Sequence, residues 1–206
     1  NPRVREFIPV AKIEVLKDEK AFFTLEKSRV LKLHGPSGCG KSSLMLELAG
    51  LTREKSYQIV YKDDKGHVIA DGNPKVLYVP QNPVIFNTNL FENITLGDSE
   101  SLLTDDLQND LEQIAEKLGI LEELNSRDIL SISTLSGGQI LRVALARALI
   151  RKPDFILIDE TFSGIHPKLA VDILRYIKSE YSVGCLIVSH NAVLDREFDD
   201  FIEWSL

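Results

Sequence analysis

The chain has 206 residues, a formal net charge of -7 at pH 7, and 44% hydrophobic residues. This composition predicts one globular domain with a sizeable core, and the acidic total argues against a general nucleic-acid-binding surface. No apolar run approaches the ~20 residues that a membrane-spanning helix needs, and the charged start NPRVREF lacks the apolar centre of a signal peptide. We therefore expect a soluble protein.

The first part of the sequence predicts strands. Residues 11–34 carry the apolar runs AKIEVL, AFFTL and RVLKL, which are separated by charged turns such as KDEK. The last run leads into a glycine-rich loop and is expected to be a central strand of a parallel sheet, although Lys32 and His34 are polar. Farther on, SYQIVY and GHVIA flank the turn DDKG and predict a β-hairpin. We therefore expect an antiparallel sheet beside the parallel one.

The glycine-rich segment GPSGCGKSS fits the pattern G-x-x-x-x-G-K-[ST] at every fixed position. Its glycines let backbone N–H groups approach an anion, and the helix that follows adds the positive end of its dipole. Lys41 is expected to reach the β and γ phosphates of a nucleotide, and the Ser42 hydroxyl is expected to ligate Mg²⁺. The expected nucleotide-binding residues are Gly35, Pro36, Ser37, Gly38, Cys39, Gly40, Lys41, Ser42 and Ser43.

Residues 82–134 are predicted to form a helical insertion between two halves of the core. The segment DDLQNDLEQIAEKLG, which Thr104 can cap and Gly119 ends, has apolar residues at helical spacing: Leu107, Leu111, Ile114 and Leu118. After the insertion, helices and strands alternate: a helix over about 138–150, the strand FILI, a helix over about 167–180 and the strand GCLIVS. This alternation predicts right-handed parallel crossovers.

Polar side chains follow three of the predicted strands. In FILIDE, Asp159 can hold Mg²⁺ through water, and Glu160 can orient or deprotonate an attacking water. Gln81 follows the strand ending YVP, and His190 follows GCLIVS. The alternatives are acids that cap a turn, a surface glutamine and a structural histidine. Because ligands of a parallel sheet gather beyond the carboxyl ends of its strands, we expect these residues to converge there.

The segment LSGGQ, residues 135–139, is a second glycine pair that opens a helix, and the same dipole argument makes it a second anion site. One ATP cannot fill both sites, because the helical insertion places this segment away from the first loop. The simplest use is to bind the γ phosphate of a nucleotide held by another subunit. The sequence therefore predicts a head-to-tail dimer with two ATP molecules in its interface.

In this order, GPSGCGKSS, Gln81, LSGGQ, FILIDE and His190 resemble the motifs of the ATP-binding cassette (ABC) ATPases over about residues 30–190. The resemblance implies an α/β P-loop NTPase core with a mostly parallel sheet, an antiparallel β subdomain and a helical subdomain. The single domain 1–206 would have its core at about 1–81 and 140–206, and its helical subdomain at about 82–139. Members of this family dimerise around two ATP molecules and separate after hydrolysis.

The resemblance also implies a role for each motif residue. Glu160 would be the catalytic base, supported by Gln81 and the switch histidine His190. The residues implied to hold Mg²⁺ are Ser42, Gln81 and Asp159, and those implied to contact the partner's ATP are Ser136, Gly137, Gly138 and Gln139. The turn after Glu160 corresponds to the D-loop, with Ser163 and with His166 where the family usually has aspartate. The histidine at position 166 has three possible explanations. It could alter hydrolysis at the partner's site, it could belong to an asymmetric heterodimer, or the D-loop could simply tolerate the replacement of aspartate.

The stretch from residue 78 to residue 97, YVPQNPVIFNTNLFENITLG, is similar to the corresponding segment of exporters whose membrane helices are fused ahead of the ATPase. In that subfamily it forms a groove for the membrane domain, whose apolar lining here would be Pro83, Ile85, Phe86 and Phe91; burial in the helical subdomain is the alternative. The implied function is ATP hydrolysis coupled to transport at the cytoplasmic face of a membrane. The implied partners are a second ABC ATPase domain, in a homodimer or heterodimer, and a transmembrane domain, with no nucleic acid. The alternative is a non-transport ABC ATPase acting in nucleic-acid maintenance or translation.

Three smaller features complete the sequence-based expectations. Cys39 and Cys185 lie in predicted nucleotide-binding and core segments, which favours a reducing, cytoplasmic compartment over a disulfide framework. Because no tyrosine precedes the glycine-rich loop, the candidates for stacking on adenine are Phe7, Phe22 and Phe23. The chain opens on Asn1 rather than Met, and we expect it to be part of a longer polypeptide.

Overall fold

A parallel sheet forms the centre of the structure, a computed structural model that describes residues 9–96, 105–126 and 135–204. Its strand order is β5-β6-β7-β3-β8, and every neighbouring pair is parallel. The strands are β3 (Val30–His34), β5 (Val76–Val79), β6 (Phe155–Asp159), β7 (Gly184–Val188) and β8 (Asp200–Glu203). The carboxyl ends of all these strands therefore lie at one edge of the sheet.

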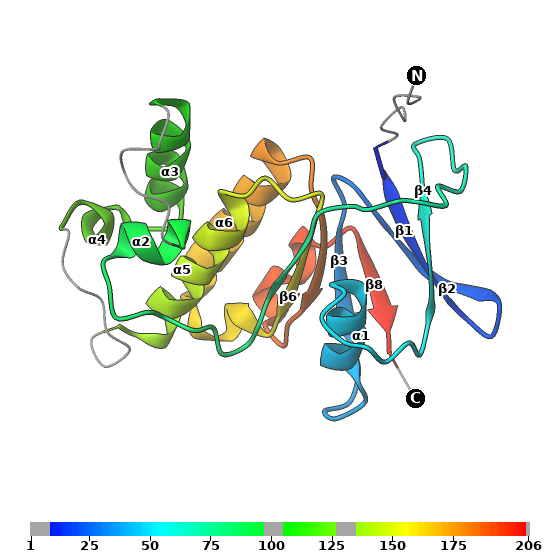
Figure 1. The fold of residues 1–206 in the computed structure, drawn as a ribbon. Helices are drawn as coiled ribbons and strands as arrows, with labels where there is room; N and C mark the ends of the chain where they lie inside the picture. The colour runs from blue at the N-terminus through cyan, green and yellow to red at the C-terminus, as the bar shows by residue number, and fades with distance from the viewer. Residues whose placement is uncertain (1–8, 97–104, 127–134, 205–206) are drawn as a thin grey trace, which may run out of the picture.

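An antiparallel sheet of order β2-β1-β4 lies at one end of the molecule (Figure 1). Its strands are β1 (Lys12–Lys17), β2 (Lys20–Glu26) and β4 (Gln58–Lys62), which confirms the strands predicted in the first part of the sequence. The predicted hairpin is wrong in its second arm: GHVIA forms only an isolated bridge between Lys62 and Val68. The arm ends soon after this bridge, where Gly72 packs against the side chain of Tyr61. The regular partner of β4 is β1.

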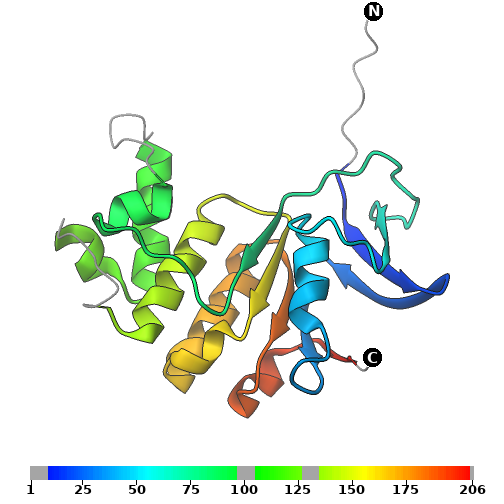
Figure 2. The same cartoon turned by 60° about the horizontal axis from the view of Figure 1, so that its bottom comes forward.

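The helices lie at the other end of the molecule and against the parallel sheet. They are α1 (Lys41–Leu48), α2 (Leu90–Thr95), α3 (Asp105–Lys117), α4 (Leu121–Ser126), α5 (Gly137–Leu149) and α6 (Pro167–Glu180), with the 3-10 helices η2 (Thr161–Gly164) and η3 (Ala192–Glu197). Figures 1 and 2 show α2, α3 and α4 grouped at the end opposite the antiparallel sheet. Thr104, the predicted cap of α3, lies outside the described residues.

The parallel sheet is buried on both faces, because its side chains alternate between two hydrophobic clusters. One cluster lies on the side of α5 and α6 and takes Val30, Ile156, Ile158, Cys185 and Ile187 from the sheet. The other lies on the side of α1 and the antiparallel sheet and takes Leu31, Leu33, Phe155, Leu157, Leu186 and Val188. No helix among the described residues is both long and apolar enough to cross a membrane.

Lys32, the polar residue in the middle of β3, is buried with its charge paired. Its side chain is 10% exposed, and its Nζ donates a hydrogen bond to Asp195 Oδ1 in η3 at 2.5 Å. The same Nζ lies 5.7 Å from the ring centre of Phe198 and 5.9 Å from that of Phe201. The ion pair and the aromatic rings together compensate the cost of burying the ammonium group.

We predict that Asp195→Asn destabilises the chain more than Lys32→Met does. Asp195→Asn leaves a buried ammonium without its counter-charge, and we expect a loss of about 1–3 kcal/mol in the free energy of unfolding. Lys32→Met fills the same space without a charge and leaves Asp195, whose side chain is 41% exposed, to water, so we expect a change below about 1 kcal/mol. Urea unfolding measures both; a larger loss for Lys32→Met would contradict this account.

Candidate nucleotide-binding and hydrolysis site

The glycine-rich loop, residues 35–43, connects the end of β3 to α1, as the sequence predicts. Gly40 has a φ of 90°, a conformation that favours glycine, and directly precedes α1. No side chain in the described part of the chain caps this end of α1, so its first N–H groups remain to be satisfied by another partner. Because the helix dipole also makes this end positive, the loop has the properties of a phosphate site.

Lys41 spans this loop. Its Nζ donates to the carbonyl oxygens of Gly35 and Pro36, at 2.9 and 2.8 Å, and the residue is 6% exposed. Ser42 and Ser43, the next residues of α1, are exposed. The ammonium group is therefore held at the loop by two carbonyl groups, where the phosphates of a nucleotide would be expected to become its partners.

Three residues from successive strand ends come together at the carboxyl edge of the parallel sheet. Gln81 follows β5, Glu160 follows β6 and His190 follows β7, and these strands are neighbours in that order. The Gln81 Nε2 donates to Glu160 Oε2 at 2.8 Å, and His190 Nε2 lies 3.4 Å from Glu160 Oε1. Glu160 has a left-handed backbone with φ of 51°, and its N–H donates to the carbonyl of Val188 in the next strand. The convergence predicted for these side chains is present.

Asp159 is held by a residue that sequence reasoning missed. The hydroxyl of Tyr78 donates to Asp159 Oδ2 at 2.9 Å, and Asp159 is 6% exposed. Burial, and then the neighbouring carboxylate, raises the pKa of Tyr78 well above its usual value, so the phenol keeps the proton that it donates. Tyr78 pairs with Leu157 across the sheet, which places it on the same face as Asp159. The alternation within each strand was readable from sequence, but this pairing of strands was not.

The oxygen atoms of Ser42 and Asp159 suit Mg²⁺, which prefers hard oxygen ligands and keeps several waters. The described residues hold no group of three or more histidine, cysteine, aspartate or glutamate side chains that could bind a metal by itself. A hydroxyl, a carboxylate at a strand end and the oxygens of a nucleotide therefore form the donor set expected for this ion. The residues present fit Mg²⁺ bound together with a nucleotide.

The segment LSGGQ forms the start of α5, and two of its side chains are used within the chain. Ser136 and Gln139 form a capping box: Ser136 Oγ accepts from Gln139 N at 3.2 Å, and Gln139 Oε1 accepts from Ser136 N at 2.9 Å. The Gln139 amide also donates to Glu123 in α4 at 2.7 Å. Contact between Gln139 and a partner's ATP therefore stays a prediction. For that contact, the Gln139 side chain would have to break its bonds to Ser136 and Glu123 or keep them while it also binds ATP.

The two glycines of this segment have different surroundings. A Cβ atom on Gly138 would lie 2.5 Å from the carbonyl oxygen of Gly164, at the end of η2. A Cβ atom on Gly137 would meet nothing within 4 Å. Gly138 is therefore explained by packing inside the chain, whereas Gly137 leaves open space at the start of the helix.

The two residues predicted for the D-loop lie between β6 and α6. For Ser163, in η2, only the backbone is described. His166 is exposed and precedes α6 as its N-cap.

The start of α5 and the phosphate loop lie apart in the chain. Figures 1 and 2 both show α5 beginning near the helical end of the molecule, with β6 between it and α1. Arg142, in α5, donates to the carbonyl oxygens of Leu118 and Gly119 at the end of α3. Its role is therefore to join α5 to α3.

The apolar lining predicted for the segment after Gln81 is only partly exposed. Pro83 and Ile85 are buried, so the prediction is wrong for these two residues as a surface, whereas Phe91 is partly buried against the core. Phe86 is 50% exposed, and Val84 and Leu96 nearby in sequence are 62% and 50% exposed. The Arg147 guanidinium lies over the Phe86 ring at 5.7 Å and donates to the Val84 carbonyl at 3.0 Å. The exposed apolar surface here therefore consists of Val84, Phe86 and Leu96.

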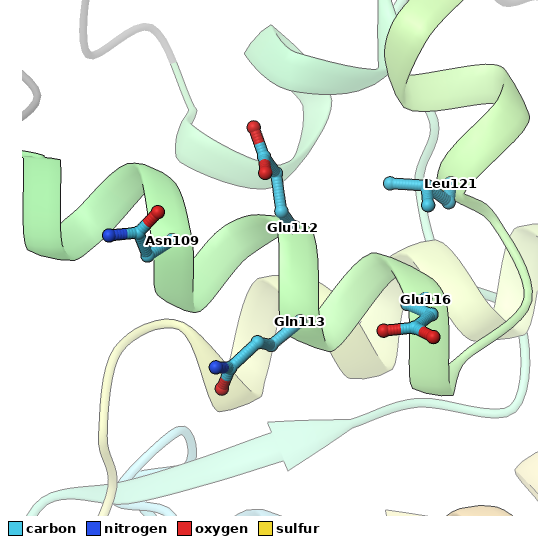
Figure 3. A pocket seen from close by; sticks show the side chains of 5 residues that line it. All are labelled: Asn109, Glu112, Gln113, Glu116 and Leu121. Carbon is cyan, nitrogen blue, oxygen red and sulfur yellow. The ribbon is translucent and has the colours of Figure 1, made fainter.

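A surface hollow of about 490 Å³ lies on α3 and the start of α4 (Figure 3). It is lined by Asn109, Glu112, Gln113, Glu116 and Leu121. None of the predicted site residues lines it, and Figures 1 and 2 show its helices at the far end from α1. The candidate site is therefore the strand-end edge and not this hollow.

The adenine-stacking candidates differ in exposure. Phe23 is 8% exposed and belongs to the core, whereas Phe22 is 38% exposed and packs edge-on against Trp204 with ring centres 5.0 Å apart. Phe7 lies outside the described residues. Of the three, only Phe22 is described as reaching the surface, and stacking on adenine stays a prediction for it.

A glycine-rich loop before a helix, a carboxylate pair at a strand end and a second glycine pair on a separate helix are the features expected of an ATP-binding cassette, and comparisons with known proteins show the same family. The family model described as ABC transporter matches residues 19–163. Molybdate/tungstate import ATP-binding protein WtpC of Methanocaldococcus jannaschii is 36% identical over 159 residues, which are 76% of this chain and 52% of that protein. The chain thus spans about half the length of this curated relative.

Solved structures share the fold. A bacterial Atm1-family ABC exporter with ATP bound superimposes with a TM-score of 0.71 at 20% identity, covering 92% of this chain and 36% of the exporter chain. The ADP conformation of an ATP-binding cassette of an ABC transporter superimposes with a TM-score of 0.68 at 21% identity, covering 96% of this chain and 88% of that cassette. A nucleotide-free ATP-binding cassette from an ABC transporter superimposes with a TM-score of 0.69 at 20% identity, covering 94% of this chain and 87% of that cassette. The chain belongs to the ABC transporter family, and it has the fold of an ATP-binding cassette.

We predict that Gly138→Ala and Gly137→Ala have different effects on the stability of the nucleotide-free chain. The Cβ of Gly138→Ala must displace the Gly164 carbonyl, and we expect the free energy of unfolding to fall by about 1–3 kcal/mol. Gly137→Ala, the matched control, meets nothing and should be neutral or stabilising by up to about 1 kcal/mol. Urea denaturation measures both. Equal losses would show that the Gly138–Gly164 contact is not what distinguishes the two glycines.

Proposed function

We propose that this chain binds ATP with Mg²⁺ and hydrolyses the bond between the β and γ phosphates, with Glu160 as the general base. The observation that carries this proposal is the position of the Glu160 carboxylate, within hydrogen-bonding distance of Gln81 and close to His190 at the carboxyl edge of the sheet. The phosphate loop follows β3 at the same edge. The carboxylate therefore lies where a water that attacks the γ phosphate can be held.

In the proposed reaction, Glu160 accepts a proton from the attacking water while the oxygen of that water forms a bond to the γ phosphorus. The bond from this phosphorus to the bridging oxygen of ADP breaks. Gln81 Nε2 and His190 Nε2 fix the two oxygens of Glu160 and so orient the carboxylate. Lys41 and the N–H groups at the start of α1 bind the phosphates. Mg²⁺, when bound near Ser42 and Asp159, supplies positive charge to the phosphate oxygens.

The site takes its remaining groups from the LSGGQ segment of a second chain, in a homodimer or a heterodimer. This part of the proposal is supported by the open surroundings of Gly137 and by the separation of α5 from α1 within one chain. Backbone N–H groups at the start of α5 would face the γ phosphate of the partner's ATP. Two ATP molecules would then hold the chains together, and hydrolysis would release them.

The proposed cycle of ATP binding and hydrolysis drives transport across a membrane. The domain would act at the cytoplasmic face of that membrane. Val84, Phe86 and Leu96 are the exposed apolar side chains of the 78–97 stretch that could contact a transmembrane domain, because exposed apolar residues often mark an interface. The 78–97 stretch favours an exporter with a fused membrane domain. An importer is the second candidate, favoured by the 36% identity to a protein named as an import ATP-binding protein. The sequence of the full gene product would decide between them, because an exporter of this kind would carry membrane-spanning segments in the same polypeptide.

We predict that Glu160→Gln retains ATP binding and loses turnover. Glutamine keeps the shape of the side chain and cannot accept the proton, so we expect kcat to fall by about 10²-fold or more. The control is Glu54→Gln, an exposed acid in another part of the chain, which should hydrolyse ATP like the wild type. Phosphate release measures turnover, and calorimetry measures binding. Wild-type turnover by Glu160→Gln would remove Glu160 from the role of base.

A further inference from the structure

Trp204 contacts the phosphate loop at two points. Its indole Nε1 donates to the carbonyl oxygen of Cys39 at 2.9 Å, in a buried position. Its backbone N–H donates to the carbonyl oxygen of His34 at 2.7 Å, which continues the pairing of β8 with β3. Its carbonyl oxygen lies so close to Gly35 that a Cβ there would be 2.1 Å away. Gly35 and Cys39, the first and fifth residues of the phosphate loop, therefore both contact Trp204.

The bond from the indole to Cys39 orients the next peptide N–H group. A trans peptide is planar, so its carbonyl and its N–H point in opposite directions. The peptide between Cys39 and Gly40 has its carbonyl oxygen directed at the indole. Its N–H, which belongs to Gly40, is therefore directed away from Trp204. Gly40 directly precedes α1, so this N–H belongs to the group of donors expected to bind phosphate.

Aromatic neighbours hold the indole in place. Trp204 is 3% exposed, and its ring centre lies 5.0 Å from that of Phe22 and 5.2 Å from that of Tyr57. Both neighbours come from the part of the chain that forms the antiparallel sheet. The backbone bond to His34 could be made by any residue except proline at position 204, but the bond to Cys39 needs the indole N–H. This is a reason for tryptophan beyond its apolar volume.

We propose that Trp204 is a positioning residue of the ATP site. Its indole N–H holds the Cys39 carbonyl inward, so that the Gly40 N–H faces the phosphates of the bound nucleotide. The inference rests on the proposed binding of ATP by the phosphate loop. It adds to that proposal a residue directly after β8, far from the loop in sequence, on which the geometry of the loop depends.

The test replaces Trp204 by 3-benzothienylalanine, which has a bicyclic ring of similar size with sulfur in place of the N–H group. Packing is kept and only the donor is lost, so the variant should fold, with a modest fall in the midpoint of thermal unfolding because the buried Cys39 carbonyl loses its partner. We expect the affinities for ATP and for ADP, measured by calorimetry, to fall about fivefold to tenfold, because the Gly40 N–H is no longer fixed toward the phosphates. In ATPase assays KM should rise by a similar factor, with a smaller change in kcat.

Two further variants complete the test. Trp204→Phe should weaken ATP binding at least as much, and Tyr57→Phe, which keeps the ring against the indole, should bind like the wild type. If the benzothienyl variant binds ATP and ADP like the wild type, the proposal is overturned, whether or not Trp204→Phe folds. Lys41→Ala separates this result from a failure of the proposed function. If Lys41→Ala binds ATP normally, the loop is not the ATP site; if it loses ATP while the benzothienyl variant does not, only the role of Trp204 is wrong.

Discussion

The geometry of the candidate site depends on the parallel register of neighbouring strands. Gln81, Glu160 and His190 each follow a different strand, and β5, β6 and β7 are adjacent in the sheet. Because parallel strands end at the same edge, side chains that are far apart in sequence meet there without a dedicated loop. The buried apolar strands make this arrangement rigid: every residue of β6 and β7 is buried. A change in strand register would separate the carboxylate from both of its neighbours.

Contacts on either side of this edge tie it to the rest of the chain. Immediately after Glu160, η2 brings the Gly164 carbonyl against Gly138 at the start of α5. The residue proposed as the base and the segment proposed to bind a partner's nucleotide are thus joined by a short, tightly packed stretch of backbone. Such a contact leaves little room for one segment to move without the other. It gives a physical route by which hydrolysis in one site could affect the second.

Sequence reasoning could identify the loop, the strand ends and the order of helices and strands because these follow local patterns of apolar, glycine and acidic residues. It could not identify contacts that depend on which strands and helices become neighbours. Tyr78 on Asp159 is one such contact, and Arg142 on the carbonyl groups at the end of α3 is another. The second arm of the expected hairpin failed for a similar reason: β4 takes β1 as its regular partner. Burial of Ile85 likewise depends on helices that pack over it.

We propose that a complete hydrolysis site needs two chains, one that supplies the phosphate loop and Glu160 and one that supplies the start of α5. The most direct measurement is the rate of ATP hydrolysis per chain over a wide range of chain concentration, with the molecular mass determined by light scattering in the same samples. The account predicts that the rate per chain rises with concentration as dimers form in the presence of ATP. A constant rate per chain in samples that remain monomeric would contradict it.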